Sequence, residues 1–469
     1  FNFFDTKRVS LSLNNLINQL IIPILLSVST YGINFHGDAA AYHLNAQLWL
    51  REEPIVFGIS NITWTYGYQS IFEYISSVFW IQDNFVFLHF INVIFMVLFF
   101  SFITDNVLNK KSNFLFYSSI LIVSFGILDN FGIDGGKNGF VVFQSIGKFD
   151  ISFAIIFTIT NILIFDNLKN NKFKNNEFFL IVTLSLFAFQ LKVFGIYLII
   201  PLIYYFYFYS LNIKKLIAKI YPFVFILIFW LLKYLINTSC LIYPVIFTCI
   251  SSLDWHTNGW VQHLVNDVRI FHNSYNFRYN FFRWFEEWRS FGENNTTIFN
   301  FIGSFFLIYL STIFFTRKEK KLSKINSFLF LYLSFLILIW LYSSPEIRFG
   351  ISIFLLLISA LSLNIKQFRF EFLNNIVNKK TLAFLIISSC FLVVRLDSYK
   401  NVVSKPFIFY EINIPSIEYV ENTSSWNVVP KDNIYECWIN IDCVPASWTT
   451  YRSRIGNNLK ITSNFDSYP

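Results

Sequence analysis

The sequence predicts an all-α, polytopic membrane protein with about eleven transmembrane helices. Hydrophobic residues make up 55% of the chain and charged residues only 14%, whereas a soluble domain carries roughly 25% charged residues. The mean hydropathy is +0.51. A helix needs about 20 largely apolar residues to cross a bilayer. Stretches of this kind lie near 12–34, 84–104, 114–129, 150–166, 178–191, 193–209, 220–236, 298–316, 327–343, 349–364 and 381–396.

The basic residues of the connecting segments predict the orientation of these helices. Lysine and arginine in short loops stay on the cytoplasmic side, because their translocation is disfavoured. On the eleven-helix count, one side holds the basic connections near 7–8, 110–111, 169–174, 214–219, 317–324 and 366–380. The other side receives loops 35–83 and 237–297, and a small segment, 397–469, that follows a transmembrane domain of residues 1–396. This topology accounts for the net charge of +8, so we predict no nucleic-acid partner, for which no basic stripe or motif exists.

The first external loop opens with ionisable residues directly after the first apolar stretch. Asp38 stands where a membrane helix meets water, and ionisable groups at such a depth tend to face a polar cavity and to take part in function. Asp38 is therefore the first candidate for a catalytic residue. Residues 38–50 predict a helix that carries Tyr42 one turn after Asp38 on the same face, with His43 next to it. Residues 68–81 predict a second amphipathic helix, and both are expected to lie on the membrane surface.

Three basic residues stand at the external mouths of later helices and are candidates to bind an anion. Lys192 interrupts an apolar run, and Lys148 precedes the helix that starts near residue 150. Arg348 lies at the start of a helix, where free backbone N–H groups favour a phosphate and its planar side chain can make paired contacts. Each of the three also fits a side chain that merely extends to the membrane surface. Asp150 either pairs with Lys148 or interacts favourably with the N-terminus of its own helix.

Two further groups of residues lie in the predicted external segments. Cys437 and Cys443 are close enough in sequence for a disulfide in an oxidising compartment, while Cys240, Cys249 and Cys390 are interpreted as apolar residues near helix ends. No cysteine and histidine spacing indicates a zinc site. Trp255 and His256 are read either as anchors in the lipid headgroup region or as substrate-binding residues.

Five pieces of the sequence follow one another in an order that carries a family resemblance: Asp38–His43 with Trp49 and Asn61; Ser145–Asp150; Leu191-Lys192; Tyr243-Pro244 with Asp254-Trp255; and Ser344–Gly350. On these pieces the chain resembles the GT-C superfamily of membrane glycosyltransferases. Within that superfamily it looks closest to a poorly characterised bacterial group of multispan proteins, and it is more distantly similar to protein O-mannosyltransferases and lipid A aminoarabinose transferases. The first loop departs from the mannosyltransferases, because it lacks their paired acidic residues.

The resemblance implies an enzyme of cell-envelope glycan biosynthesis in the bacterial inner (cytoplasmic) membrane, with an active site that faces the periplasm or exterior. It implies transfer of a sugar from a polyprenyl-phosphate donor to a glycan, lipid or protein acceptor. Asp38 would be the base, and a carboxylate whose pKa burial raised would serve better. The resemblance assures no cofactor but leaves open a divalent metal beside Asp38. The remaining candidates divide into phosphate-binding residues, Arg348, Lys192 and Lys148, and substrate-binding residues, Tyr42, His43, Asp150, Trp255 and His256.

Two other classes of function remain as alternatives. A lipid-linked sugar or polysaccharide transporter, such as a flippase, typically carries charges within its spans and inverted repeats. The predicted spans are nearly free of charge apart from Lys233, and the candidate residues gather on the external side. A non-enzymatic assembly subunit would tolerate replacement of Asp38. The sequence favours the glycosyltransferase.

Overall fold

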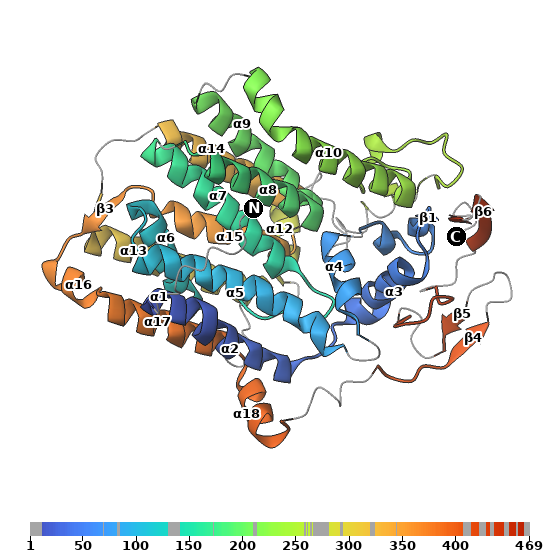
Figure 1. The fold of residues 1–469 in the computed structure, drawn as a ribbon, viewed down its shortest axis with the longest axis horizontal. Helices are drawn as coiled ribbons and strands as arrows, with labels where there is room; N and C mark the ends of the chain where they lie inside the picture. The colour runs from blue at the N-terminus through green and yellow to red at the C-terminus, as the bar shows by residue number, and fades with distance from the viewer. Residues whose placement is uncertain are drawn as a thin grey trace.

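A computed structural model describes most of the chain between residues 12 and 463. The described part leaves out 69, 82–84, 130–140, 172, 210–212, 258, 260, 263–264, 266–280, 291–293, 319–323, 344, 407–413, 422–427, 432–435, 445–449 and 456–457. It is predominantly helical, and most of its helices run along one bundle (Figure 1).

Within the described part of the chain, six helical stretches are long and apolar enough to cross a membrane. They are Leu13–Gly32, formed by α1 (Leu13–Leu16), η1 (Ile17–Ile21), α2 (Ile22–Ser27) and η2 (Val28–Gly32), then α5 (Val86–Leu108), α7 (Asp150–Asn170), α10 (Ile213–Thr238), α13 (Asn294–Phe315) and α14 (Lys324–Ser343). A seventh is formed by α17 (Lys379–Val393) and α18 (Leu396–Ser404) if this pair, bent by 77°, counts as one span. The fold is therefore that of a helical membrane protein.

The other predicted spans correspond to shorter apolar helices of 10–17 residues. These are α6 (Asn113–Leu128), α8 (Asn175–Leu191), η7 (Val193–Leu198) with α9 (Ile199–Phe208), and α15 (Ile347–Ala360). At about 1.5 Å per residue, a helix of this length falls short of a hydrocarbon core of about 30 Å. The number of eleven spans therefore stays a prediction.

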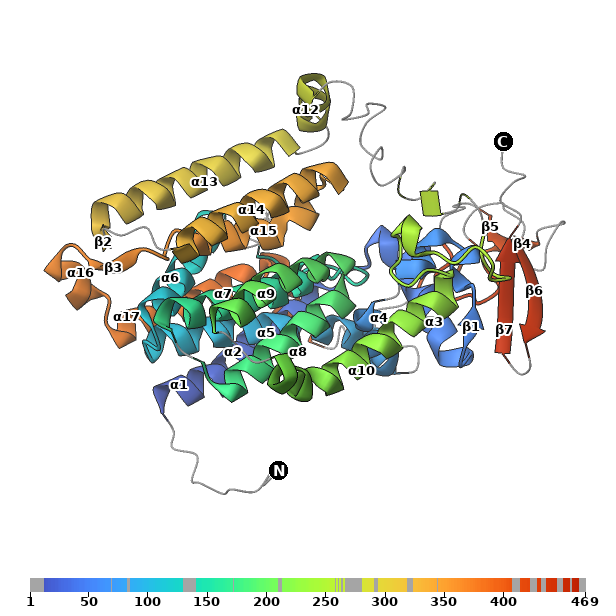
Figure 2. The same ribbon diagram turned by 90° about the horizontal axis from the view of Figure 1, so that it is seen from above.

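The centre of the bundle is α7, which is apolar on all sides, as expected of a helix surrounded by protein. Within its most apolar window, 89% of the residues are buried, and α7 packs against α15, α8, α6 and α5. By contrast, only 17% of the corresponding windows of α10 and α13 are buried. Figure 2 shows these two helices on opposite sides of the bundle. Their exposed apolar side chains suit contact with lipid.

The loop predicted to be the first external one, residues 35–83, and the C-terminal segment gather at one end of the bundle (Figure 1). The loop contains η3 (Ala39–His43), α3 (Leu44–Glu52), β1 (Val56–Phe57), η4 (Ile59–Asn61), η5 (Trp64–Tyr68) and α4 (Ile71–Phe79). The helices predicted over 38–50 and 68–81 are thus present, while their position on a membrane surface stays a prediction. At the opposite end, β2 (Thr316–Lys318) pairs antiparallel with β3 (Ile365–Phe368), which α16 (Glu371–Ile376) follows.

The C-terminal segment contains strands that the sequence did not predict. β6 (Thr450–Ile455) pairs antiparallel with β7 (Asn458–Ser463), and β7 pairs parallel with β1 of the first external loop. β4 (Tyr419–Glu421) and β5 (Val428–Pro430) form a second antiparallel pair. In addition, the backbone N–H of Trp438 donates to the carbonyl of Ala40 at 2.8 Å. The segment is therefore joined to the loop that carries Asp38.

Two disulfides lie in the segments that the sequence predicts to be external. Cys437 bonds to Cys443, as the spacing of these residues predicted. The interpretation of Cys240 and Cys249 as apolar residues was wrong, because they form the second disulfide, just after α10. A turn that contains η8 (Ile246–Thr248) folds the chain back and brings the two sulfurs together. Cys390 is buried and free.

Candidate functional site

Two segments distant in sequence meet beside Asp38. The backbone N–H of His36 donates to the carbonyl of Ile146 at 3.0 Å, and the N–H of Ile146 donates to Asn34 at 3.1 Å. Gly147 has a φ of +91°, and a Cβ at this position would lie 2.6 Å from the nitrogen of Ala39. A glycine is needed here both for the positive φ and for the close approach. This contact brings Lys148 to the start of η3.

The turn that follows Asp38 is a π turn rather than the predicted α-helical turn. The N–H of Leu44 donates to the carbonyl of Ala39, five residues back. Such π turns are rare and frequently lie at functional sites. Both Tyr42 and His43 lie in this turn, and each interacts electrostatically with the Asp38 carboxylate. Tyr42 packs on the His43 ring, with the ring centres 4.2 Å apart.

Asp38 is held by two neighbours. Its carboxylate lies 3.4 Å from Nη1 of Arg348 and 3.4 Å from Nδ1 of His36. Burial acts to raise the pKa of Asp38, but the His36 contact and the charge of Arg348 outweigh burial and hold the pKa well below its usual range. The His36 contact requires a proton on Nδ1, which otherwise accepts the backbone N–H of Asp38 at 3.1 Å. Arg348 is therefore the partner that does not depend on the protonation of His36.

The pKa of Asp38 is therefore not raised, although a raised pKa would make Asp38 a better base. The carboxylate is ionised and able to accept a proton, but while Arg348 remains in place it is a weak base. Arg348 also donates through Nε to Glu346, its neighbour at the start of α15. One guanidinium thus connects two carboxylates.

Asp150 pairs with Lys192, so the predicted pair of Asp150 with Lys148 was wrong. Asp150 is in the first turn of α7, as the alternative prediction placed it, and Lys192 ends α8, where an extended backbone stops the helix. The Lys192 ammonium also lies 4.5 Å from the centre of the Phe349 ring. The guanidinium of Arg348 lies 4.8 Å from the same ring centre. Phe349 thus connects the two ion pairs.

Lys148 differs from the other two cations, since it makes no ion pair with any described residue. Burial and the nearby charge of Arg348 lower the pKa of Lys148, while Asp38, Asp150 and Glu346 act in the opposite direction. Lys148 therefore interacts electrostatically with all three carboxylates. We call the set formed by Asp38, Lys148, Asp150, Lys192, Glu346 and Arg348 the ion-pair cluster.

The ion-pair cluster is assembled from four segments and lies at the end of the helical bundle that the sequence predicts to be external. It contains three carboxylates and three cations, so its formal charges balance. An anion can therefore bind in two ways: it can replace a carboxylate as the partner of a cation, or it can bind to Lys148. Five of the six members were predicted from the sequence. Glu346 was missed, although its position two residues before Arg348 could have indicated a partner for that side chain.

A buried polar network lies next to the ion-pair cluster. The ring nitrogen Nδ1 of His43 contacts the carboxylate of Glu73 on α4, and Nε2 of Gln47 donates to the second oxygen of Glu73 at 2.7 Å. Only 3% of Glu73 and 7% of His43 are exposed. Sequence analysis did not single out Glu73, although it is the one acidic residue in the predicted 68–81 helix.

Trp255 and His256 make a different set of contacts. The indole N–H of Trp255 donates to the carbonyl of Leu235 at 3.1 Å, and Asn61 donates to the carbonyl of Trp255 at 3.0 Å. Nδ1 of His256 lies 2.7 Å from the hydroxyl of Ser239. These contacts join the end of α10 to the first external loop, so the two residues are placed as connecting elements rather than as members of the ion-pair cluster.

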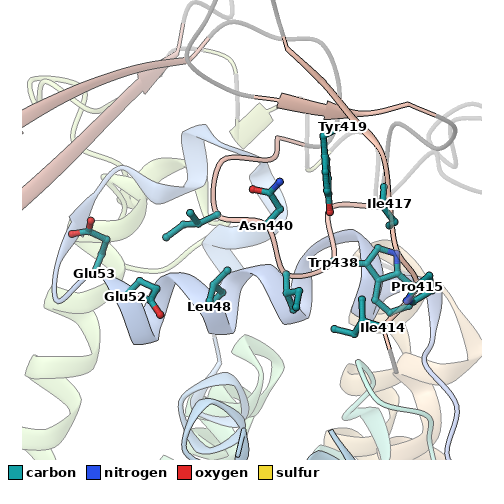
Figure 3. A pocket seen from close by; sticks show the side chains of 11 residues that line it. Leu48, Glu52, Glu53, Ile414, Pro415, Ile417, Tyr419, Trp438 and Asn440 are labelled. Carbon is teal, nitrogen blue, oxygen red and sulfur yellow. The ribbon is translucent and has the colours of Figure 1, made fainter. Parts of the chain in front are cut away.

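A cleft of about 720 Å³ lies beside α3, away from the ion-pair cluster. Figure 3 shows α3 along one side of it, with Tyr419 and Trp438 of the C-terminal segment across from the helix. Its size falls within the range of small-molecule sites, about 300–1,000 Å³. Its lining consists of Leu48, Glu52 and Glu53 from α3 and of residues 414, 415, 417, 419 and 438–441.

The expectation of a divalent metal finds no set of ligands. Among the described residues, no group of three or more histidine, cysteine, aspartate or glutamate side chains is placed to hold a metal ion. The Asp38 carboxylate instead lies 3.4 Å from Nη1 of Arg348 and 3.4 Å from Nδ1 of His36.

The comparisons with known proteins give one match. No curated protein and no solved structure matches the chain significantly. A family model described as a domain of unknown function, DUF8201, matches residues 1–355. The matched part contains the whole ion-pair cluster and the His43 network, and it covers well over half of the chain. The chain is a member of the DUF8201 family.

Proposed function

We propose that this protein is a membrane glycosyltransferase that moves a sugar from a polyprenyl-phosphate donor to an acceptor on the non-cytoplasmic side. The observation that carries the proposal is the ion-pair cluster. Its arrangement places a carboxylate, Asp38, beside two cations, Arg348 and Lys148, at the end of an apolar helical bundle. Glycosyl transfer from a lipid phosphate needs a proton acceptor and cations for the leaving phosphate at such a boundary.

The distribution of disulfides and basic residues supports an external position for the ion-pair cluster. Both disulfides lie at the same end of the bundle as Asp38, and disulfides persist in oxidising compartments. The two-stranded sheet of β2 and β3 at the opposite end carries Arg317, Lys318 and Lys366. Basic residues favour the cytoplasmic side. We therefore place the protein in the inner membrane with the ion-pair cluster toward the periplasm or exterior.

The proposed reaction starts with an exchange of ion pairs. The donor lipid lies against the apolar bundle, its phosphate binds Lys148, and Arg348 leaves Asp38 for the phosphate. Without its guanidinium partner, the pKa of Asp38 rises toward its ordinary value, so the carboxylate becomes a stronger base as the donor binds. Asp38 then takes the proton of the acceptor hydroxyl.

The transfer step forms one bond and breaks another. The acceptor oxygen bonds to the anomeric carbon of the sugar, the bond between that carbon and the phosphate oxygen breaks, and polyprenyl phosphate leaves with the electron pair. Lys148 and Arg348 stabilise the charge that develops on the leaving phosphate. The acceptor side lies toward α3, whose far end borders the cleft of Figure 3.

The proposal is tested by incubating the purified protein in detergent micelles with a panel of polyprenyl-phosphate sugars and measuring released polyprenyl phosphate. We expect at least one donor to be consumed, with micelles lacking protein as the control. A second assay reconstitutes the protein in vesicles and follows movement of the same lipids across the bilayer. Movement without release would contradict the proposal and support the transporter.

A further inference from the structure

The His43 network holds an imidazole in one fixed orientation. Glu73 contacts Nδ1 of His43 with one oxygen, while its other oxygen accepts from Gln47 at 2.7 Å. The carboxylate therefore cannot rotate without breaking a buried hydrogen bond. Helices α3 and α4, which pack against each other, provide Gln47 and Glu73. The arrangement leaves His43 with a single nitrogen, Nε2, for other partners.

That second nitrogen has no protein partner among the described residues. Nδ1 of His89 is a buried nitrogen without a hydrogen-bond partner, but Nε2 of His43 is not such an atom. Nε2 of His43 therefore retains access to solvent or substrate. The ring lies with its centre 5.8 Å from that of Phe149, the residue that links Lys148 to Asp150. His43 lies in the π turn that follows Asp38, close enough to interact electrostatically with its carboxylate.

Asp38 needs a neighbouring base that can take over its proton. Arg348 and His36 keep the protonated form of Asp38 unfavourable in the resting site, and a protonated His43 would lower the pKa of Asp38 further. Once polyprenyl phosphate leaves and Arg348 returns to Asp38, the carboxylate must give up the proton it took. An imidazole is a stronger base than a carboxylate, and an adjacent buried carboxylate stabilises the imidazolium.

We infer that His43, held by Glu73, takes up the proton that Asp38 removes from the acceptor hydroxyl and releases it to external water. This inference rests on the proposed glycosyltransferase function. The proton moves from the acceptor oxygen to the Asp38 carboxylate, then to Nε2 of His43, and then to water. Asp38 and His43 are the catalytic residues in this scheme, and Glu73 is a positioning residue.

The test compares three variants on a donor that the wild type consumes: His43→Ala, Glu73→Gln and His89→Gln. His89 is a matched control, because it is a buried histidine of α5 whose Nε2 lies 3.5 Å from Ser29. We expect kcat to fall about tenfold or more for His43→Ala, with an unchanged KM for the acceptor, and to fall less for Glu73→Gln. Added imidazole should restore turnover in His43→Ala and have no effect on His89→Gln.

Several outcomes would overturn the inference. If His43→Ala turns over like the wild type, or if imidazole leaves its lowered kcat unchanged, His43 does not carry the proton. If His43→Ala does not fold, His43→Gln keeps a donor toward Glu73, and a wild-type kcat for this variant overturns the inference equally. A wild type that consumes no donor overturns the proposed function together with the inference, whereas an active wild type separates the two.

Discussion

Asp38→Asn is expected to lower the rate of donor consumption by about 10²-fold or more. Asparagine has nearly the same shape as aspartate, but its amide neither takes up the acceptor proton nor carries the negative charge that pairs with Arg348 3.4 Å away. Because Arg348 then has one carboxylate partner fewer, donor affinity should stay the same or increase. The effect should therefore fall on kcat rather than on the KM for the donor, as measured by release of polyprenyl phosphate.

A suitable control for this variant is Asp254→Asn. Asp254 is an aspartate at the same end of the molecule, paired with Lys460 at 3.4 Å, and 75% of its side chain is exposed. We expect Asp254→Asn to keep wild-type turnover and Asp38→Asn to keep a wild-type elution profile in detergent. Equal loss in both variants, or no loss in Asp38→Asn, contradicts the role of Asp38 as base.

Asp150→Asn is expected to destabilise the protein by about 3–5 kcal/mol, the usual cost of removing one partner of a buried ion pair. Only 7% of the Asp150 side chain and 21% of the Lys192 side chain are exposed, so the substitution leaves an ammonium uncompensated in an apolar region. The free energy of unfolding is measured by titration with sodium dodecyl sulfate in mixed micelles.

The double variant Asp150→Asn with Lys192→Met removes both charges, and we expect it to recover most of the lost stability. Lys174→Gln is the control, because it breaks an exposed pair with Glu177, in which 63% of the Lys174 side chain is exposed. Such a pair contributes about 1 kcal/mol or less. If Asp150→Asn costs no more than Lys174→Gln, the pair of Asp150 and Lys192 does not hold α7 and α8 together.

Hydropathy was sufficient to predict the helical bundle but not the strands outside it. Apolar stretches predict helices such as α5 and α7 because the signal for each helix lies within its own residues. The sheet of β1, β7 and β6 depends instead on pairing Val56 with Leu459 across most of the chain. A two-residue strand has no detectable periodicity. The disulfide between Cys240 and Cys249 was missed for a related reason, since the spacing alone did not show that the chain folds back.

The sequence was sufficient to predict which charged residues lie in the candidate site, but not which of them pair with one another. Asp38, Lys148, Lys192 and Arg348 could be selected because each is an ionisable residue at the end of an apolar stretch. Which carboxylate meets which cation depends on how helices pack, so the pairing of Asp150 with Lys192 could not be read from the sequence. No local pattern predicted the π turn after Asp38, which brings His43 as well as Tyr42 near the Asp38 carboxylate.

The measurement that tests the central claim most directly is the affinity of polyprenyl phosphate, without a sugar, for the wild type and for Arg348→Gln. Arg369→Gln is the matched control, since Arg369 is an exposed arginine at the opposite end of the bundle. We expect the wild type and Arg369→Gln to bind polyprenyl phosphate equally, and Arg348→Gln to bind it about tenfold more weakly. Polyprenol, which lacks the phosphate, should bind all three proteins weakly and alike. If polyprenol binds as tightly as polyprenyl phosphate, or if Arg348→Gln binds like the wild type, the ion-pair cluster is not a phosphate site and the proposed function is wrong.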